Sequence, residues 1–376
     1  MSTFSAAILE VVVGEDGMKL LRFLERRLVG PPPKTALHKW IRTGQVRVNS
    51  ARTTPFSLLT AGDRVRVPPF AQPRALESSA TLPAGKPAPA LSSENVPDLG
   101  DGVTVLARTD ALLALAKPAG LPCQPGEGHK DSLSTRLASA YACSAYIPAP
   151  AHRIDRHTSG LVLAGLTHVA QRQLHELFAG GGIRKEYLAW VWGDWPHDGT
   201  CILEDRLAKQ RGAAGRESMT VLPGGRSIPV PEKTAISSYA TALPSSPGSA
   251  TSVALAVKKL STDALPRALF SGNGNTPSNG RATLLLLRLL TGRTHQLRTQ
   301  LASRGFPIIG DGRYLGPHYS HMLLHAFSLT LPPEFGAEEY CLPPPWPTPF
   351  SVDAVCLVRP RRRMAMIFEE KERTQT

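Results

Sequence analysis

The chain has 376 residues and carries 43 lysines and arginines against 30 aspartates and glutamates, a formal net charge of +13 at neutral pH. This length suggests two domains with linkers. No apolar run approaches the ~18 residues of a membrane span, and the N-terminus lacks the basic region of a signal or transit peptide. We therefore expect no membrane association and a cytoplasmic location, with an organelle or the nucleus left open.

The positive charge and the cysteine pattern narrow the class of protein further. A soluble protein this basic most often binds a polyanion, and nucleic acid is the first candidate. The alternative is a merely basic surface, or a basic tail such as the run at 359–366. The five cysteines are scattered without a CxxC, which indicates reduced thiols and neither a disulfide framework nor a zinc site. His318, His321 and His325 have no cysteine or carboxylate nearby, so we expect no metal.

Residues 8–68 have the pattern of a small compact unit. GMKLLRFLERRLV predicts a helix with an apolar stripe, and TALHKWIRTG predicts a second helix with Thr35 as its N-cap and Gly44 just after its end. QVRVNS and DRVRVP alternate apolar and basic residues, as half-buried strands do. The basic residues that would form one surface are Lys39, Arg42, Arg47, Arg64 and Arg66.

This unit resembles the small RNA-binding module named after ribosomal protein S-four. The pattern of that module, IRxGxVxVN followed by GDxVxV, is present as WIRTGQVRVN and AGDRVRV. One departure is Ser50, at a turn where the module usually has glycine. The resemblance implies that residues 8–68 bind RNA through the basic residues named above.

The rest of the chain divides by composition. Residues 69–100 are rich in proline, alanine and serine without periodicity, which predicts a linker, and residues 359–376 form a charged tail. Residues 101–358 alternate predicted strands and helices, with neither GxGxxG nor a GxxxxGKS-type phosphate loop, so no nucleotide cofactor is expected. Gly-, Pro- and Ser-rich stretches within about 211–281 are interpreted as surface-loop insertions. We expect an α+β domain around a mixed, mainly antiparallel sheet.

One carboxylate stands among basic residues in HRIDRHTSG (152–160). Because nearby positive charge favours the ionised form of a carboxyl group, Asp155 is suited to act as a nucleophile or base and is a poor general acid. An exposed salt-bridge cluster would show the same charge pattern. The neighbours that are basic or can become so are His152, Arg153, Arg156 and His157.

The segment RKEYLAWVWG (184–193) has the period-two pattern of a strand. Leu188, Trp190 and Trp192 share one face, which we expect to pack under a helix. Tyr187 lies on the opposite face, where its ring could stack on a nucleobase. A tyrosine of the hydrophobic core fits the same pattern.

A third segment, THQLRTQLASRG, predicts a helix with Thr294 as its N-cap, ended by Gly305. Arg293, His295 and Arg298 cluster at its N-terminal end, where the helix dipole is already positive. Clustered cations are unfavourable there unless an anion lies beside them. The expected anion is a phosphate or a carboxylate such as Asp155.

These three segments, in this order, resemble the RluA-type pseudouridine synthases. The hallmarks of that family are HRLDxxTSG, KxYxAxVxG and TGRTHQIRxHLxxxGxPIxGDxxYG. AKPAGLPCQPG (116–126) and LLHAFSLTLPP (323–333) resemble two further segments of the family. Among the departures are Ile154 for leucine, Leu297 for isoleucine and Gln300 for histidine, and none of these three removes a functional side chain.

The resemblance implies roles for individual residues. Asp155 matches the catalytic aspartate that attacks the target uridine, Arg298 the arginine that pairs with it, and Tyr187 the aromatic residue that stacks on the target base. Arg153 matches a residue that fills the gap left by the flipped nucleotide in some members. By the same resemblance, no cofactor or metal takes part. The other residues that we expect to bind RNA here are Arg156, Arg293 and His295.

The expected function is isomerisation of uridine to pseudouridine in structured RNA by a monomer, with rRNA favoured over tRNA because of the N-terminal module. Two alternatives stay open. The first is a catalytically inactive RNA-binding protein of the same fold. The second is a ribonuclease that uses His152 or His295 as acid and base.

Overall fold

A computed structural model describes residues 7–30, 32–73, 98–126, 130–142, 144, 146–211, 217–230, 251–264, 280–332 and 339–352. The chain divides into two compact units. Unit 1 comprises Met1–Leu115, Cys123–Arg153 and Val162–Gly180, and unit 2 comprises Ala116–Pro122, Ile154–Leu161 and Gly181–Thr376. The predicted tail (359–376) and most of the predicted linker (74–97) lie outside the described residues. No helix in the described ranges is long and apolar enough to cross a membrane.

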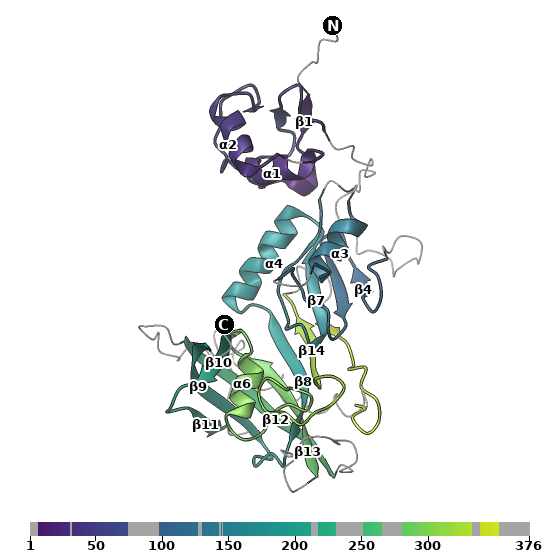
Figure 1. The fold of residues 1–376 in the computed structure, drawn as a ribbon, viewed down its shortest axis with the longest axis vertical. Coiled ribbons are helices and arrows are strands. Elements are labelled where there is room, and N and C mark those ends of the chain that lie inside the picture. The colour runs from purple at the N-terminus through teal and green to yellow at the C-terminus, as the bar shows by residue number, and fades with distance from the viewer. Residues whose placement is uncertain are drawn as a thin grey trace, which may run out of the picture. The chain divides into compact units, whose positions relative to one another are not determined.

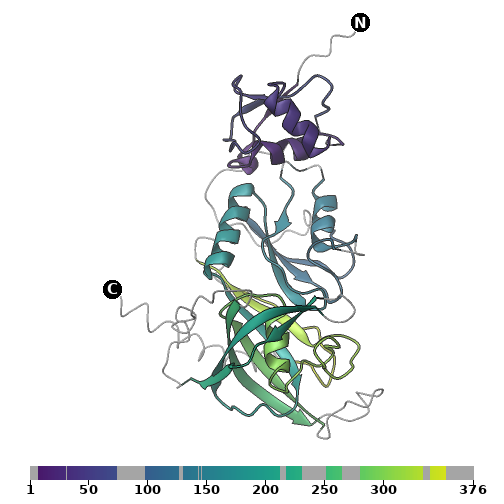
Figure 2. The ribbon, with the colours of Figure 1, turned by 60° about the vertical axis from the view of Figure 1, so that its left-hand side comes forward.

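The N-terminal part of unit 1 is built around a hydrophobic cluster, to which Tyr146 from later in the chain also belongs. Its elements are β1 (Ile8–Glu10), the 3-10 helix η1 (Val13–Glu15), α1 (Leu20–Arg27), α2 (Lys34–Arg42), β2 (Arg47–Val48) and β3 (Arg64–Arg66). The strands form an antiparallel sheet in the order β1-β3-β2, and α1 and α2 lie side by side (Figure 2). Leu20, Leu24 and Leu28 of the predicted stripe are fully buried, because residues four apart lie on one face of a helix.

The turns around α2 differ in part from the prediction. Thr35 is not the N-cap: Pro33 occupies that position, with an extended ψ of 146°, and Thr35 lies within the helix. Pro32 precedes Pro33, and a residue before proline disfavours the helical region, so the helix begins only after these two prolines. At the other end Gly44 stands just after the helix, as predicted, with φ +73°. Ser50, at the turn where the resembled module usually has glycine, also has a left-handed backbone with φ +70°.

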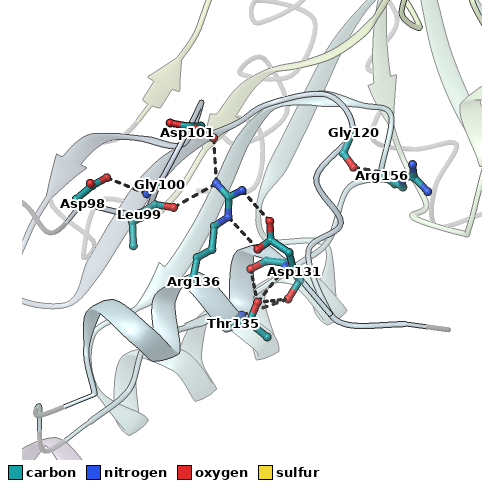
Figure 3. A network of polar contacts seen from close by, with 10 residues as sticks. Asp98, Leu99, Gly100, Asp101, Gly120, Asp131, Thr135, Arg136 and Arg156 are labelled. Carbon is teal, nitrogen blue, oxygen red and sulfur yellow. Dashed lines mark hydrogen bonds and ion pairs between the residues drawn. The ribbon is translucent and has the colours of Figure 1, made fainter. Parts of the chain in front are cut away.

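The remainder of unit 1 combines strands with two helices. The strand order is β7-β5-β4, with β6 paired to β7, and β5 and β7 each continue into unit 2. Arg136 of α3 donates two hydrogen bonds to Asp131, one to the carbonyl oxygen of Asp101 (2.9 Å) and one to that of Leu99 (3.3 Å), and the last of these attaches the end of the predicted linker to α3 (Figure 3). The elements are β4 (Thr104–Arg108), β5 (Leu112–Lys117), α3 (Leu133–Ala140), β6 (Ala149–Pro150), β7 (Ser159–Gly165) and α4 (His168–Gly180).

Unit 2 is built around a mixed, mainly antiparallel sheet, as predicted. Its elements are β8 (Arg184–Trp192), β9 (Thr200–Arg211), β10 (Glu217–Val221), β11 (Arg226–Pro229), β12 (Thr251–Ala264), β13 (Arg281–Leu289), α6 (Gln296–Ala302), β14 (Leu324–Thr330) and β15 (Glu339–Cys341). Antiparallel strands follow in the order β10-β9-β12-β13-β8-β14, and β14 pairs in parallel with the start of β7. Helix α6 lies against this sheet (Figure 1).

Two predictions about unit 2 are wrong. The 211–281 region is not only surface loop, because β10, β11 and the fourteen-residue β12 lie within it and β12 pairs with both β9 and β13. The apolar stretch TSVALAV was not predicted as a strand because Gly-, Pro- and Ser-rich segments flank it.

The face of Trp190 and Trp192 does not pack under a helix among the described residues. It packs against other strands and against Trp346 and Phe350 of the proline-rich segment at 343–350.

Candidate active site

Asp155 stands in a turn that leads directly into β7. The backbone N–H of Thr158 donates to the carbonyl oxygen of Asp155 (3.1 Å) and closes the turn. Two residues later Gly160 has φ +119°, and a Cβ on it would lie 2.3 Å from the carbonyl oxygen of Ala326. Glycine therefore allows β7 to lie against β14 immediately after the turn, which fixes the position of the carboxylate.

The loop that follows β5 is bonded to the turn of Asp155, because one lysine donates to backbone carbonyl groups of both segments. Lys117, at the end of β5, is 1% exposed. Its ammonium group donates to the carbonyl oxygens of Pro118 (2.7 Å), Leu121 (2.7 Å) and Arg156 (3.2 Å). The backbone N–H of Gly120 donates to the carbonyl oxygen of Arg156 (2.8 Å). In return, Arg156 Nε donates to the carbonyl oxygen of Gly120 (3.2 Å), a bond drawn in Figure 3. The residue next to Asp155 is thus tied to this loop.

Helix α6 is attached to the sheet by two glutamine side chains. Gln296 Nε2 donates to the carbonyl oxygen of Ala254 (3.0 Å), and Gln300 Nε2 donates to that of Leu203 (3.2 Å). Gln300 also donates to Asp205 Oδ2 (2.6 Å). All of these groups are buried, so the bonds compensate for the loss of water. Gln300, which departs from the family pattern, therefore contributes to the placement of α6.

The start of α6 is not capped as predicted. His295, not Thr294, is the N-cap, and its backbone is left-handed with φ 53° and ψ 18°. The side chain of Gln296 organises this turn instead, because its Oε1 accepts hydrogen bonds from the Arg293 N–H (3.1 Å) and the Thr291 hydroxyl (3.0 Å). The left-handed backbone, sparsely populated by residues other than glycine, brings His295 to the site.

Arg298 of α6 joins two carboxylates. Its Nη1 lies 3.1 Å from Asp155 Oδ2, while Nε and Nη2 each lie 2.7 Å from one oxygen of Asp311. The side chains of Arg298 and Asp311 are 7% and 1% exposed, and that of Asp155 is 22% exposed. Burial opposes the charge of Arg298, but the hydrogen bonds and negative charge of Asp311, and then of Asp155, outweigh it and raise the pKa of Arg298. The anions beside the predicted cation cluster are therefore two carboxylates, the expected Asp155 and the unexpected Asp311.

His295 and Tyr314 complete the surroundings of this ion pair. His295 Nε2 lies 3.8 Å from Asp155 Oδ2, and its Nδ1 lies 2.9 Å from the Tyr314 hydroxyl. The Arg298 guanidinium lies over the Tyr314 ring, 5.1 Å from its centroid. Burial lowers the pKa of His295; Asp155 acts in the opposite direction, and Arg298 adds to the decrease. Of Arg298 and His295, the two residues described beside Asp155, Arg298 is thus the permanent cation.

Tyr187 lies on the face of the sheet that α6 covers. Cross-strand partners, and residues two apart on one strand, project to the same face. Tyr187 pairs with Leu287 on β13, and Leu289, two residues further along β13, pairs with Leu255 on β12. Leu255 pairs with Leu203 on β9, and Asp205 lies two residues further along β9, so all of these residues share one face. Asp205 accepts a hydrogen bond from Gln300 of α6. Tyr187 is 7% exposed and faces away from the tryptophan cluster, as the alternation predicted.

The other predicted site residues lie at the surface or fold back on their own segments. Arg47 is half-buried and donates to the carbonyl oxygens of Gly44 and Ser50 (3.3 Å each). His152 Nε2 accepts a hydrogen bond from the Leu163 N–H (3.1 Å). The residues whose side chains are exposed are Lys39, Arg42, Arg64, Arg153, Arg156 and Arg293.

Three residues of this arrangement were not predicted from the sequence. Asp311 and Tyr314 stand in the quoted GDxxYG hallmark, as GDGRY, and Lys117 stands in AKPAG. The signal for Asp311 was available, since a buried arginine needs more acceptors than one carboxylate oxygen supplies. Nothing in the local pattern of the sequence marks Lys117 as a donor to carbonyl groups on a different segment.

Comparison with solved structures places the fold. The human protein "RNA Pseudouridylate Synthase Domain Containing 1" matches with a TM-score of 0.51 at 19% identity, covering 71% of this chain and 97% of the human one. The α+β architecture of the chain is therefore that of a pseudouridine synthase domain.

Sequence comparisons agree with the fold. The profile of the RNA pseudouridylate synthase family matches residues 111–303. Ribosomal large subunit pseudouridine synthase C of Escherichia coli (strain K12) is 28% identical over 324 residues, covering 86% of this chain and 84% of the relative. The protein of that name from Haemophilus influenzae is 26% identical over 334 residues, covering 86% and 87%. The chain belongs to the RNA pseudouridylate synthase family, whose members isomerise uridine in RNA.

Proposed function

We propose that the chain converts uridine to pseudouridine in structured RNA, with rRNA favoured over tRNA, and that Asp155 is the nucleophile. The observation that carries this proposal is the contact of Asp155 with Arg298, 3.1 Å long, in which the arginine is buried and the carboxylate stays partly exposed. In the described part of the chain, the hydrogen bond and ion pairs of the Asp155 side chain all involve Oδ2. Oδ1 is therefore the oxygen that attacks.

The reaction needs such a carboxylate because one bond to the ribose is exchanged for another. The Asp155 oxygen forms a bond to C1′ as the N1–C1′ bond of uridine breaks, and that bond breaks again when the C5–C1′ bond forms. C5 loses a proton and N1 gains one, so the carboxylate is regenerated. A carboxylate can attack without a separate base to activate it. Arg298 orients Asp155 and Tyr187 stacks on the flipped base, which compensates in part for the unstacking of the RNA.

The N-terminal part of unit 1 is proposed to bind the RNA away from the reacting base. Lys39 and Arg42 are exposed and lie three residues apart on α2, and Arg64 and Arg66 are exposed on β3. Such groups neutralise phosphates without reading sequence. The preference for rRNA is supported by this module and by the names of the relatives, which are ribosomal large subunit enzymes.

The test is a pseudouridine map of total RNA from cells that carry the wild-type gene, a deletion, or the Asp155→Asn variant. We expect defined sites, in rRNA, to vanish in the deletion and in Asp155→Asn, while purified Asp155→Asn still binds the RNA. Asp198→Asn is the matched control, because its side chain is 93% exposed and the change is chemically the same. An unchanged map in Asp155→Asn would overturn the mechanism, and cleavage of the RNA strand would indicate a ribonuclease.

A further inference from the structure

An exposed leucine lies next to the candidate site and has no part in the proposed chemistry. Leu315 is 83% exposed, and its backbone is left-handed with φ +63°. Among the residues that the structure describes, it is the strongly exposed large hydrophobic residue of unit 2. The others lie in the N-terminal part of unit 1: Ile8, Val13, Val29, Phe56, Leu58 and Phe70.

The loop that presents Leu315 is fixed by backbone hydrogen bonds. Gly310 N–H donates to the carbonyl oxygen of Pro317 (2.9 Å), and Gly316 N–H donates to that of Asp311 (2.9 Å). A Cβ on Gly316 would lie 2.0 Å from the carbonyl oxygen of Ile308, so the chain is closely packed directly after Leu315. The exposure of this side chain is therefore built into the loop.

Leu315 also directly follows a residue of the site. Tyr314 contacts His295 through its hydroxyl group and Arg298 through its ring. Arg298 and Asp311 are buried beneath Asp155, so a substrate reaches Asp155 from its solvent-exposed side. Leu315, whose Cα is ~3.8 Å from that of Tyr314, therefore presents an exposed apolar side chain one residue away from this site.

A single exposed leucine is ordinary, but a bulky residue in the left-handed region is not. Such strain persists where the surrounding structure imposes it, and it gathers at functional sites. We propose that Leu315 packs against the bases that flank the target uridine and helps to keep the uridine out of the stack. Extrusion of a base uncovers apolar base faces, and leucine is among the side chains that insert between base steps. This inference rests on the proposed function.

The experiment compares two synthetic RNAs that contain a uridine found by the pseudouridine map. One RNA holds the uridine in a paired stem, and the other is a single strand with the same flanking bases. Leu315→Gly is the main variant, because glycine adopts a positive φ without strain and the change removes only the side chain. Leu315→Met keeps an apolar side chain and serves as the rescue variant. The measured quantity is kcat/KM for pseudouridine formation.

We expect Leu315→Gly to lower kcat/KM by about tenfold on the stem and by less than about twofold on the single strand, where little unstacking is needed. Leu315→Met should match the wild type on both. Equal losses on both RNAs, or no loss on either, would overturn the proposal. Activity retained by Asp155→Asn would overturn the proposed mechanism alone. A wild-type protein inactive on both RNAs would overturn the proposed function and this inference together.

Discussion

Arg298 divides its three donor nitrogen atoms between two carboxylates, two to Asp311 at 2.7 Å each and one to Asp155 at 3.1 Å. A guanidinium group is planar and rigid, so the paired bonds to Asp311 set the direction of the third nitrogen. Asp155 is therefore held by a cation whose orientation is decided by a different, fully buried carboxylate. The geometry of the proposed nucleophile depends on a residue that does not touch it.

Replacement of Asp311 by asparagine should lower the rate of catalysis more than RNA binding. An asparagine side chain would accept only one of the two bonds from Arg298, and a small misplacement of Asp155 can lower kcat by about a hundredfold. Asp311 is 2% exposed, so KM should change little. Steady-state kinetics of Asp311→Asn, with Asp198→Asn as the exposed control, checks this. An unchanged kcat in a folded variant would show that the paired bonds do not position Asp155.

The stability of the protein should fall as the pH is lowered from 6.5 to 4, in part because of His325. Burial lowers the pKa of His325 to about 4. Both ring nitrogen atoms of the neutral side chain are bonded: Nε2 donates to the carbonyl oxygen of Leu342 (2.9 Å), and Nδ1 accepts from the Ser159 hydroxyl (2.8 Å). Between pH 6.5 and 4 the unfolded chain binds a proton at this residue that the folded chain does not. Unfolding is therefore favoured as pH falls, by up to about 3 kcal/mol at pH 4.

Thermal unfolding of wild type and His325→Gln at pH 7, 5.5 and 4.5 measures that contribution. The glutamine cannot be protonated, so its melting temperature should fall less over this range than that of the wild type. Identical slopes would mean that His325 does not titrate as its burial suggests.

Substitution of Gly160 by alanine should severely destabilise the protein. The new Cβ would lie 2.3 Å from the carbonyl oxygen and 2.6 Å from the nitrogen of Ala326, and the φ of +119° disfavours alanine as well. We expect a loss of at least about 3 kcal/mol in the free energy of unfolding. Gly180→Ala is the control, since a Cβ there meets nothing within 4 Å. Chemical denaturation of both variants provides the comparison, and equal midpoints would contradict the close approach of β7 and β14.

Substitution of Ser50 by glycine should stabilise the protein slightly. Ser50 has φ +70°, at the position where the module that it resembles usually has glycine. Relief of the left-handed strain should outweigh the extra freedom of the unfolded chain, with a net gain of up to about 1 kcal/mol. The melting temperature checks this, with Ser57→Gly as a control at a serine without a positive φ. A lower melting temperature in Ser50→Gly would contradict the prediction.

Removal of the exposed cations on α2 should weaken RNA binding in a salt-dependent way. Each side chain that no longer neutralises a phosphate should reduce the slope of log affinity against log salt by about one, so Lys39→Ala with Arg42→Ala should reduce it by about two. Lys34→Ala is the control, because that ammonium already lies 3.7 Å from Glu25. Filter binding at several salt concentrations measures the slopes. Equal slopes for the double variant and the wild type would remove α2 from the RNA-binding surface.

Local patterns predicted much of the secondary structure, and they failed where a distant residue decides the outcome. The i, i+4 leucines of α1 and the alternation along β8 follow from the repeat of helix and strand, which any short window of sequence contains. The N-cap at Thr294 was wrong because the side chain of Gln296 organises that turn. The tryptophan face of β8 was assigned to a helix because a covering segment such as 343–350 has no periodicity to reveal it.

The sequence by itself determined the residue types of the site, since its three segments contain a carboxylate among cations, an aromatic residue on a strand and an arginine on a helix. The tertiary structure alone decided which of them meet: Asp155 and Arg298 are 143 positions apart, and Asp311 and Tyr314 enter from a separate loop. Short-range patterns record the local preferences of the backbone. The meeting of distant charges depends instead on how strands pair and where a helix lies on the sheet, which is settled only when the whole core is packed.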